Sequence, residues 1–321
     1  MSEVRVAVVG VGPRGLNHLE AMQNLPTAEV VGYCDPSSDA LARAAAMAPQ
    51  AEAFSGIEEL MTALPSGERL DAVVTSGPQE LNAPMALPFV EAGVATLMEK
   101  PPGIYLHETQ ELVAAQQRGG APLMVAFNRR FHPLLETALA AVRERGPVVQ
   151  VVAEFHKSLA QLEQAGRYTP AVRERAFVES PIHAVDWALY AAGDRGLQRL
   201  HAASGRAEGR LIDSHAALAV AESGTIIQLT AAYTTGGRLE RYEIHGLGIS
   251  AYLEGVRAGH FVINGETSPI EAPDDDSTGL QAAHFIDLVV RGGTVETPAC
   301  GTAGAIRAME VVEAVVAAAD G

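Results

Sequence analysis

Cysteine is scarce in this sequence, which contains only Cys34 and Cys300. Two cysteines are too few for a disulfide framework, and neither has His or Cys neighbours at metal-ligand spacing, so no metal site is expected and a reducing compartment fits. The sequence also lacks a signal-peptide pattern and an apolar run of about 18 residues, which predicts no membrane partner. We therefore expect a cytoplasmic protein.

Positive charge is the second shortage. The chain has 23 Lys and Arg residues against 39 Asp and Glu residues, for a formal net charge of -16. Basic clusters do not extend beyond short pieces such as Arg129-Arg130, and a phosphate backbone requires a concentrated basic face, so nucleic acid is excluded as a partner. The acidic run Asp274-Asp275-Asp276 is interpreted as a solvated loop, because no further metal ligands converge on it in the sequence.

The composition is that of a globular protein with two domains. Hydrophobic residues make up 48% of the 321 residues, and the 31 Gly and 18 Pro are spread along the chain, which argues against disordered tails. A chain of this length exceeds one ordinary core. We expect one domain over residues 1–124 and a second domain over residues 125–321.

The first 130 residues alternate between apolar strands and helices. Such alternation indicates a doubly wound parallel sheet that helices cover on both faces. The expected strands are Val4 to Val9, Glu29 to Cys34, Ala72 to Ser76, Ala95 to Met98 and Leu123 to Phe127. The expected helices are Leu16 to Leu25, Ser38 to Ala46 and Ile57 to Leu64.

After Gly146-Pro147 longer alternating runs predict a large, open, mostly antiparallel sheet, with Ser223-Gly224 and Gly236-Gly237 as hairpin turns. Its apolar alternation on both faces predicts a homodimer or homotetramer that covers the open face. The expected strands are Val148 to Lys157, His215 to Glu222, Thr225 to Tyr233, Arg238 to His245 and Ile249 to Leu253. The expected helices are Pro181 to Ala192, Leu280 to Val290 and Thr302 to Ala318.

A glycine-rich turn follows the first strand and opens the first helix, with the spacing Gly10-x-Gly12-x-x-Gly15. Glycines at this spacing allow a tight turn and close backbone approach to a pyrophosphate, which the helix N-terminus attracts. The second strand ends at Asp35, where an acid can accept hydrogen bonds from ribose hydroxyls and repels a 2'-phosphate. The pattern favours NAD(H) over NADP(H). Residues 1–124 are thus expected to form a dinucleotide-binding Rossmann domain, and residues 125–321 an α+β domain for substrate binding and oligomerisation.

The motif Glu99-Lys100-Pro101 directly follows a buried strand, and two later motifs follow it, Asn128-Arg129-Arg130-Phe131 and Glu179-x-x-x-His183-x-x-Asp186. In this order the motifs resemble the glucose-fructose oxidoreductase, inositol dehydrogenase and rhizopine-catabolism family, written Gfo/Idh/MocA, over essentially the whole chain. The resemblance implies that Lys100 lies by the nicotinamide. It also implies that Glu179 and His183, from the second domain, lie close to Lys100 where the substrate binds.

This chain departs from the family pattern at three positions. The acid in the family is usually Asp, so Glu179 is one methylene longer. Pro181 stands where many relatives have Gly or Leu, and Asn82 stands where many have His. Asn82 cannot titrate near neutral pH, so we assign its loop to cofactor contact rather than proton transfer.

The chemistry of alcohol oxidation requires a base within reach of the hydroxyl that loses its proton. His183 has a suitable intrinsic pKa, and Glu179 lies four residues earlier, so on a helix both would project from one face. Together with the position by the nicotinamide that the resemblance implies for Lys100, this makes Lys100, His183 and Glu179 the expected catalytic residues. The expected cofactor-binding residues are Gly10, Gly12, Pro13, Arg14, Gly15, Asp35, Ser76, Pro78, Asn82, Glu99, Lys100 and Pro101.

The candidates for substrate contact come from the second domain. They are Arg129, Arg130, Lys157, Tyr168 and Asp186. One of the two arginines is expected to pair with substrate or a carboxylate and the other to be solvated. Alternate residues of the strand Ala153 to Lys157 could line the substrate face, which makes Lys157 and either Glu154 or His156 candidates, and Tyr168 would belong to a loop over the site.

Three functions remain open from the sequence. The leading one is an NAD-dependent dehydrogenase that acts on the CH-OH group of a sugar, polyol or related hydroxylated small molecule. The second is an NAD-dependent lyase or glycosidase in which the cofactor is reduced and reoxidised within one turnover. The third is a dinucleotide-binding protein without turnover.

Overall fold

The computed structural model describes residues 3–64, 70–158, 160, 168–206 and 213–319. The chain divides into two compact units, residues 1–128 with 276–305 and residues 129–275 with 306–321. The first unit therefore contains the expected Rossmann domain and also the segment 276–305, which lies far along the chain.

The N-terminal unit is built on a six-stranded parallel sheet in the order β3-β2-β1-β4-β5-β6. This order reverses direction between β1 and β4, as in the expected doubly wound fold. The strands are β1 (Val4–Val9), β2 (Ala28–Cys34), β3 (Glu52–Phe54), β4 (Ala72–Thr75), β5 (Ala95–Met98) and β6 (Leu123–Val125).

Helices connect these strands, as right-handed crossovers between parallel strands require. They are α1 (Pro13–Gln23), α2 (Ser38–Met47), α3 (Ile57–Ala63), α4 (Asn82–Glu91) and α5 (Leu106–Gly119), with 3-10 turns η1 (Gln79–Leu81) and η2 (Asn128–Phe131). Part of the sheet's core is a cluster of buried apolar side chains, including Val9, Phe54, Leu60 and Phe89. The strand β3 and the helices α4 and α5 had no counterpart in the sequence analysis.

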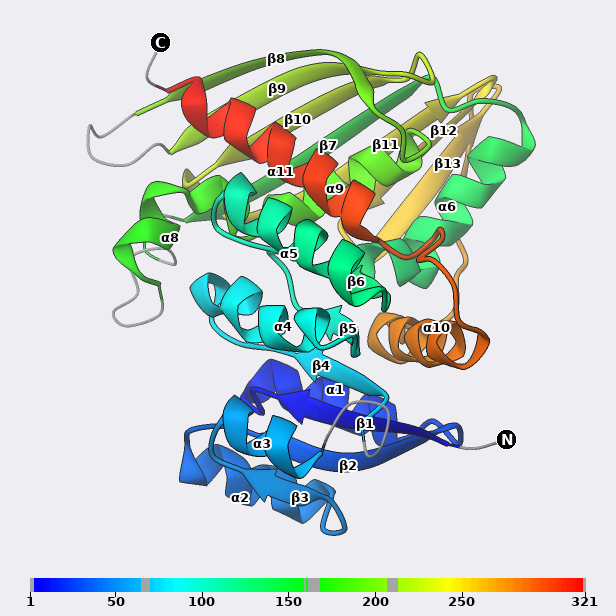
Figure 1. Ribbon diagram of the computed structural model, residues 1–321. Coiled ribbons are helices and arrows are strands. Elements are labelled where there is room, and N and C mark those ends of the chain that lie inside the picture. The colour runs from blue at the N-terminus through cyan, green and yellow to red at the C-terminus, as the bar shows by residue number, and fades with distance from the viewer. Residues whose placement is uncertain (1–2, 65–69, 159, 161–167, 207–212, 320–321) are drawn as a thin grey trace. The chain divides into compact units, whose positions relative to one another are not determined.

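Helix α10 (Ser277–Arg291) explains why the first unit includes a distant segment. It packs against α1 and β1 (Figure 1), and it buries Ala282, Phe285, Ile286 and Leu288. An amphipathic helix is stabilised mainly by burying its apolar face, so α10 belongs with the sheet that supplies that contact and not with its neighbours in sequence.

The C-terminal unit is built on an eight-stranded mixed sheet in the order β14-β13-β12-β11-β7-β10-β9-β8. Neighbouring strands in this sheet are antiparallel except β7 with β10, which agrees with the expected mostly antiparallel sheet. The strands are β7 (Gln150–Ser158), β8 (Leu197–Gly205), β9 (Ser214–Ala221), β10 (Ile226–Ala232), β11 (Thr234–Gly246), β12 (Ile249–Glu254), β13 (Ala258–Ile263) and β14 (Glu266–Pro269).

The helices α6 (Pro133–Glu144), α9 (Ile182–Ala191) and α11 (Thr302–Ala317) lie against one face of this sheet (Figure 1). The short α8 (Pro170–Glu174) and the 3-10 turn η3 (Ala176–Val178) precede α9. Along β9 and β10, buried residues alternate with residues exposed on the opposite face. Two of these exposed residues are apolar, Leu218 of β9 and Ile226 of β10, which keep 48% and 43% of their surface exposed.

Two turns expected in this sheet had different outcomes. Ser223-Gly224 connects β9 to the antiparallel β10, as predicted. The prediction of a hairpin turn at Gly236-Gly237 is wrong, because both glycines lie inside β11. There the pairing of β11 with β7 shifts register between Thr234 and Leu239. Glycine inside a strand often marks such an irregularity. β8, β13, β14 and α6 had no counterpart in the sequence analysis.

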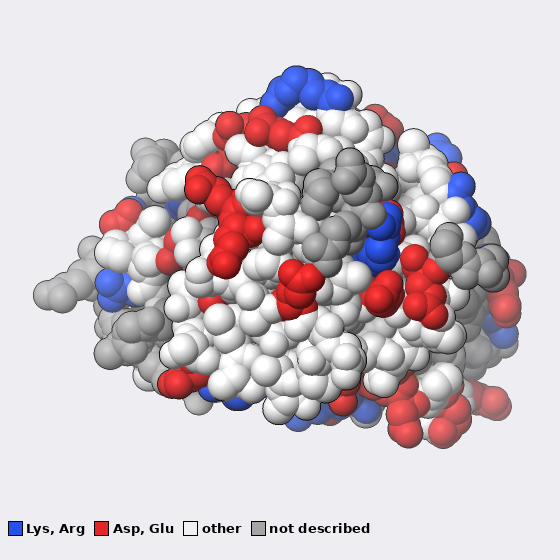
Figure 2. Space-filling view, turned by 60° about the horizontal axis from the view of Figure 1, so that its bottom comes forward, with Lys and Arg blue, Asp and Glu red and all other residues white. Residues whose placement is uncertain are grey.

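The surface carries charge of both signs. On the face drawn in Figure 2, Asp and Glu side chains form several separate groups, and Lys and Arg side chains lie among them in short stretches. In the part of the chain that the structure describes, no helix is long and apolar enough to cross a membrane.

Candidate functional site

The glycine-rich turn between β1 and α1 is closely packed against its own domain. Gly10 has φ +80, and a Cβ there would lie 2.0 Å from the carbonyl oxygen of Ser76. A Cβ at Gly15 would lie 1.8 Å from the carbonyl oxygen of Gly10. Real Cβ atoms do not approach backbone oxygens so closely, so the turn requires glycine at both positions.

A cavity of about 500 Å³ opens beside this turn. It is lined by Gly10, Gly12, Pro13, Arg14, Gly15, Asp35, Pro36, Ser76, Gly77, Pro78, Leu81 and Met85. Eight of the twelve expected cofactor-binding residues line it. The other four, Asn82, Glu99, Lys100 and Pro101, do not, whereas Pro36, Gly77, Leu81 and Met85 were not expected.

The residues of this cavity fit a dinucleotide. Gly12 is the N-cap of α1 and Pro13 its first residue, so the N-terminus of the helix, with its N–H groups and partial positive charge, faces the turn. A Cβ at Gly12 would meet no protein atom within 4 Å. The missing side chain thus leaves space at the helix N-terminus, where a pyrophosphate binds in such folds.

Asp35 completes the cavity at the carboxyl end of β2. Its Oδ2 accepts a hydrogen bond from the N–H of Val11 and its Oδ1 one from the N–H of Ser37, each at 2.9 Å. These two bonds fix the carboxylate on the cavity wall, in the position where a ribose would meet it.

Glu99 follows β5 and lies buried behind the turn. Its Oε1 accepts from Arg14 Nε at 2.6 Å and from His18 Nε2 at 2.8 Å, and its Oε2 accepts from the N–H of Lys100 at 3.1 Å. Burial alone raises the pKa of Glu99, but the hydrogen bond from His18 and the charge of Arg14 outweigh it and hold the pKa at about 2. Glu99, which was expected to contact the cofactor, is therefore a buried anion that binds two side chains of α1.

Asn82 links the loop after β4 to the loop after β5. Its Oδ1 accepts from the N–H of Gly77 at 3.2 Å, and its Nδ2 donates to the carbonyl oxygen of Pro101 at 3.3 Å. The Lys100-Pro101 peptide bond is cis. Since Asn82 is buried and uses its amide in this way, it orders the loops beside the cavity.

In the C-terminal unit, Glu179 is the centre of a buried polar cluster. Its Oε2 accepts from Lys157 Nζ at 2.6 Å and its Oε1 from the Tyr168 hydroxyl at 3.0 Å, and it also accepts from the Ser180 hydroxyl. Lys157 lies on the buried face of β7 with Phe155, whereas Glu154 and His156 belong to the other face. The structure thus joins three expected site residues, Glu179, Lys157 and Tyr168.

Glu179 and His183 do not lie on one helix, so the expectation that helical spacing places them on one face is wrong. His183 is the second residue of α9, whereas Glu179 precedes that helix and caps η3. Pro181 separates them as the N-cap of α9, a site that tolerates proline because the first turn needs no N–H donor.

The two adjacent arginines both pair with carboxylates, so the expectation that one of them is solvated is wrong. Arg129 Nε donates to Glu240 at 2.7 Å and its Nη2 donates at 3.1 Å. Arg130 is 1% exposed and binds both oxygens of Asp186, at 2.7 and 2.9 Å. It also donates to Asp194 at 2.9 Å. Arg130 and Asp186 are therefore engaged with each other inside the C-terminal unit.

The acidic run before α10 also has roles that the sequence analysis did not assign. Its residues are exposed, as expected for a loop. Asp276 is the N-cap of α10 and accepts from the N–H of Gly279 at 3.2 Å, while Asp275 lies 3.5 Å from His132 Nε2. The described ranges contain no group of three or more His, Cys, Asp or Glu residues that could hold a metal ion.

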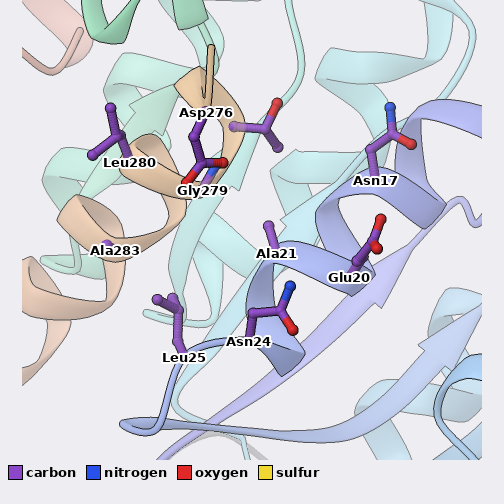
Figure 3. Close-up of a pocket in the computed structure, with 10 residues that line it drawn as sticks. Asn17, Glu20, Ala21, Asn24, Leu25, Asp276, Gly279, Leu280 and Ala283 are labelled. Atoms are coloured by element: carbon purple, nitrogen blue, oxygen red, sulfur yellow. The ribbon is translucent and has the colours of Figure 1, made fainter. Parts of the chain in front are cut away.

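A second cavity, of about 520 Å³, lies between α1 and α10. Figure 3 shows Asn17, Glu20 and Asn24 of the α1 segment on one side and Asp276 and Leu280 at the start of α10 on the other. Thr278 also lines this cavity, and its hydroxyl accepts from Arg14 Nη1 at 3.1 Å. This hydrogen bond joins a residue of the second cavity to a residue of the first.

Replacement of Gly12 by Ala tests whether the first cavity binds the cofactor. We expect the affinity for NADH to fall at least ~10-fold, because the methyl group enters the space for the pyrophosphate. The free energy of unfolding should change by at most about 1 kcal/mol, the cost of an alanine N-cap.

Gly56→Ala is the matched control, since Gly56 is the N-cap of α3 and its Cβ would also meet nothing within 4 Å. It should leave NADH affinity unchanged when both are measured by fluorescence titration. Equal affinity in the two variants would mean that the dinucleotide does not bind at Gly12.

Comparisons with known proteins agree with this geometry. Residues 4–127 match the model of an oxidoreductase family with an NAD-binding Rossmann fold, GFO_IDH_MocA. The chain is 32% identical over 235 residues to a D-apiose dehydrogenase of Paraburkholderia graminis, a match that covers 71% of this chain and 60% of that protein. It is 30% identical over 166 residues to a glycosyl hydrolase family 109 protein of Stenotrophomonas maltophilia, covering 49% of this chain and 37% of that protein.

The fold extends this similarity beyond the first domain. A UDP-N-acetylglucosamine 3-dehydrogenase from Acidithiobacillus ferrooxidans superimposes with a TM-score of 0.81 at 20% identity, covering 100% of this chain and 99% of that one. Together with the motifs carried by the glycine turn and by Glu99-Lys100-Pro101, these matches identify the chain as a member of the Gfo/Idh/MocA family of oxidoreductases with an NAD-binding Rossmann fold.

Proposed function

We propose that this protein is an NAD-dependent dehydrogenase that transfers a hydride between a CH-OH group of a sugar, polyol or related hydroxylated small molecule and nicotinamide. The observation that carries this proposal is the cavity at the glycine turn, with Gly12 open to it and Asp35 fixed in its wall. The similarity to a D-apiose dehydrogenase supports a sugar or polyol as the substrate class.

The proposed cofactor is NAD rather than NADP. Asp35 presents a carboxylate in the cavity wall, and a carboxylate accepts hydrogen bonds from two ribose hydroxyls but repels a 2'-phosphate. The neighbouring residues Pro36, Ser37 and Ser38 supply no positive charge to bind that phosphate.

Replacement of Asp35 by Ala should weaken NADH binding and reduce the preference for NADH over NADPH by about tenfold or more, equivalent to about 1.4 kcal/mol. Asp35→Asn, which removes the charge but keeps a side chain of the same shape, should reduce the preference similarly. Titration of both cofactors against each variant measures the ratio. An unchanged ratio would show that Asp35 does not read the ribose.

In the proposed mechanism this chain binds the cofactor, orients the substrate and moves the hydroxyl proton. The residues of the glycine turn and Asp35 would hold NAD, whose nicotinamide would supply the hydride acceptor or donor. Lys100 follows the carboxyl end of β5, the edge where doubly wound sheets bind their ligands, and it polarises the substrate oxygen or relays its proton. His183 is the base that receives this proton in the oxidation direction.

Glu179 supports the proposed base from its buried cluster. Lys157, Tyr168 and Ser180 donate to its carboxylate, and these donors favour its ionised form. Glu179 would then supply a fixed negative charge close in sequence to His183. Lys157 and Tyr168 act in this proposal through Glu179 and are candidates to contact the substrate.

The remaining substrate candidates have weaker support. Arg129 binds Glu240 and is 13% exposed, so it stays a candidate at the edge of the site. Arg130 and Asp186 are each 1% exposed and bind one another. We therefore leave this pair out of the proposed substrate set.

The proposal includes a cytoplasmic homodimer or homotetramer that forms through the open sheet face. Leu218 and Ile226 support this, because they keep large apolar side chains exposed on neighbouring strands. A groove of about 420 Å³ on the same strands contains Leu218, Ala216 and Gln228. Apolar surface of this kind is typical of an interface between subunits.

The experiment that tests the function measures NADH absorbance with a panel of aldoses, inositols and sugar acids. Net formation of NADH supports the dehydrogenase. A second candidate function is favoured by the similarity to a glycosyl hydrolase family 109 protein: a lyase or glycosidase that forms product without net NADH and incorporates solvent deuterium next to the transiently oxidised carbon. Cofactor binding without turnover across the panel would overturn both.

A further inference from the structure

Three N–H donors converge on the buried carboxylate of Glu99. Two of them come from side chains of α1, Arg14 Nε and His18 Nε2, and the third is the backbone N–H of Lys100. Glu99 lies 81 residues after His18 and 85 residues after Arg14 in the sequence. Glu99 therefore connects the helix that follows the glycine turn to the chain that carries Lys100.

The bonding pattern defines which nitrogen of His18 is the donor in this cluster. An ionised carboxylate only accepts hydrogen bonds, so His18 must carry its proton on Nε2. Among the described residues no partner meets His18 Nδ1, although that atom is buried. Glu99 Oε1 thus receives one hydrogen bond from the His18 ring and one from the guanidinium of Arg14.

Arg14 gives this cluster access to the cofactor cavity. It lines that cavity, and its guanidinium is held from two sides, by Glu99 through Nε and by Thr278 of α10 through Nη1. A guanidinium fixed beside the helix N-terminus adds positive charge where a pyrophosphate would bind, without the entropic cost of ordering a free side chain.

We propose that Glu99 is a positioning residue that couples the dinucleotide turn to Lys100, with His18 and Arg14 as its partners. Through Arg14 it sets the affinity for the dinucleotide, and through the Lys100 backbone it sets the position of the proposed catalytic lysine. The inference rests on the proposed function, because it assumes that the cavity binds NAD and that Lys100 acts on substrate.

A carboxylate is required at this position by the number of donors. The two oxygens of Glu99 accept three N–H groups, whereas Gln offers one oxygen and one NH₂ group. In a Glu99→Gln variant the NH₂ group would face at least one of the three donors, and a buried donor without an acceptor is costly.

The test uses Glu99→Gln together with two variants of His18. Glu99→Gln should weaken NADH binding at least ~10-fold and lower kcat at saturating cofactor by a similar factor. His18→Gln can present an N–H close to the position of Nε2, so it should stay within about threefold of the wild type, whereas His18→Leu should reproduce the loss in Glu99→Gln. A purely structural role for His18 would make His18→Gln and His18→Leu alike.

Asp71→Asn is the control for a general loss of stability. Asp71 binds Arg5 at 2.7 and 2.9 Å, just before β4 and thus at the edge of the sheet opposite the cavity. This variant should lower the melting temperature without changing NADH affinity.

The outcomes separate this inference from the proposed function. If wild-type protein binds no NADH, the proposed function fails. If the wild type binds NADH and both Glu99→Gln and His18→Leu bind it equally well with unchanged kcat, the coupling through Glu99 is wrong. If Glu99→Gln does not fold, the comparison of His18→Gln with His18→Leu decides, and equal behaviour of these two overturns the inference.

Discussion

Replacement of Lys100 by Met is expected to reduce turnover at least ~10²-fold while NADH affinity changes little. The reason is that Lys100 lies outside the lining of the cofactor cavity but directly follows Glu99 at the carboxyl end of β5. Loss of a positioned proton-transfer group removes a factor of this size. Steady-state kinetics and a fluorescence titration with NADH measure the two quantities separately.

Lys100→Arg distinguishes proton transfer from simple charge. Arginine keeps the positive charge but does not release its proton near neutral pH, so this variant should be nearly as slow as Lys100→Met if Lys100 relays a proton. Recovery of most of the activity would indicate that only the charge matters. Wild-type turnover in Lys100→Met would remove Lys100 from the mechanism.

The largest effect on stability is expected for Asp186→Ala. This change leaves the guanidinium of Arg130, which is 1% exposed, without its bidentate partner. Removing one partner of a buried ion pair typically costs about 3–5 kcal/mol, because the remaining charge stays out of water, and the lower end of this range applies here because Asp194 still binds Arg130. We therefore expect a large drop in the denaturant midpoint of the C-terminal unit.

The chain provides its own probe for this measurement, since its single tryptophan, Trp187, follows Asp186 in α9 and is buried. Unfolding of the C-terminal unit can be followed by Trp187 fluorescence. Glu144→Ala, which removes an exposed carboxylate at the end of α6 in the same unit, should change the stability by at most about 0.5 kcal/mol. A similar midpoint for both variants would contradict a stabilising role for Asp186.

The sequence predicted the N-terminal sheet well because the signals there are local. The apolar runs of β1 and β5 coincide with the strands that form, and buried parallel strands are continuous apolar segments. The strand β3 was missed because only one of its three residues is buried. In the C-terminal sheet the pair Gly236-Gly237 led to the prediction of a hairpin turn, whereas the pairing of β11 with β7 keeps both glycines inside one strand.

The sequence predicted those site residues whose roles depend only on residues close to them in the chain. Gly10, Gly12, Gly15 and Asp35 follow from the spacing of one strand-turn-helix unit. The roles of Glu99 and Asn82 did not follow, because their partners lie on other elements. His18 was missed altogether, although its place on α1 was part of the predicted helix.

The sequence by itself determined the dinucleotide turn, the alternation that produces the parallel sheet and the order of motifs that identifies the family. Only the tertiary structure decided which carboxylate meets which cation: Glu99 with Arg14, Asp186 with Arg130 and Glu179 with Lys157. Turns and strands are specified by a few consecutive residues and their own backbone geometry. Buried ion pairs join residues tens of positions apart, and the packing that brings them together also removes the water that would otherwise solvate them.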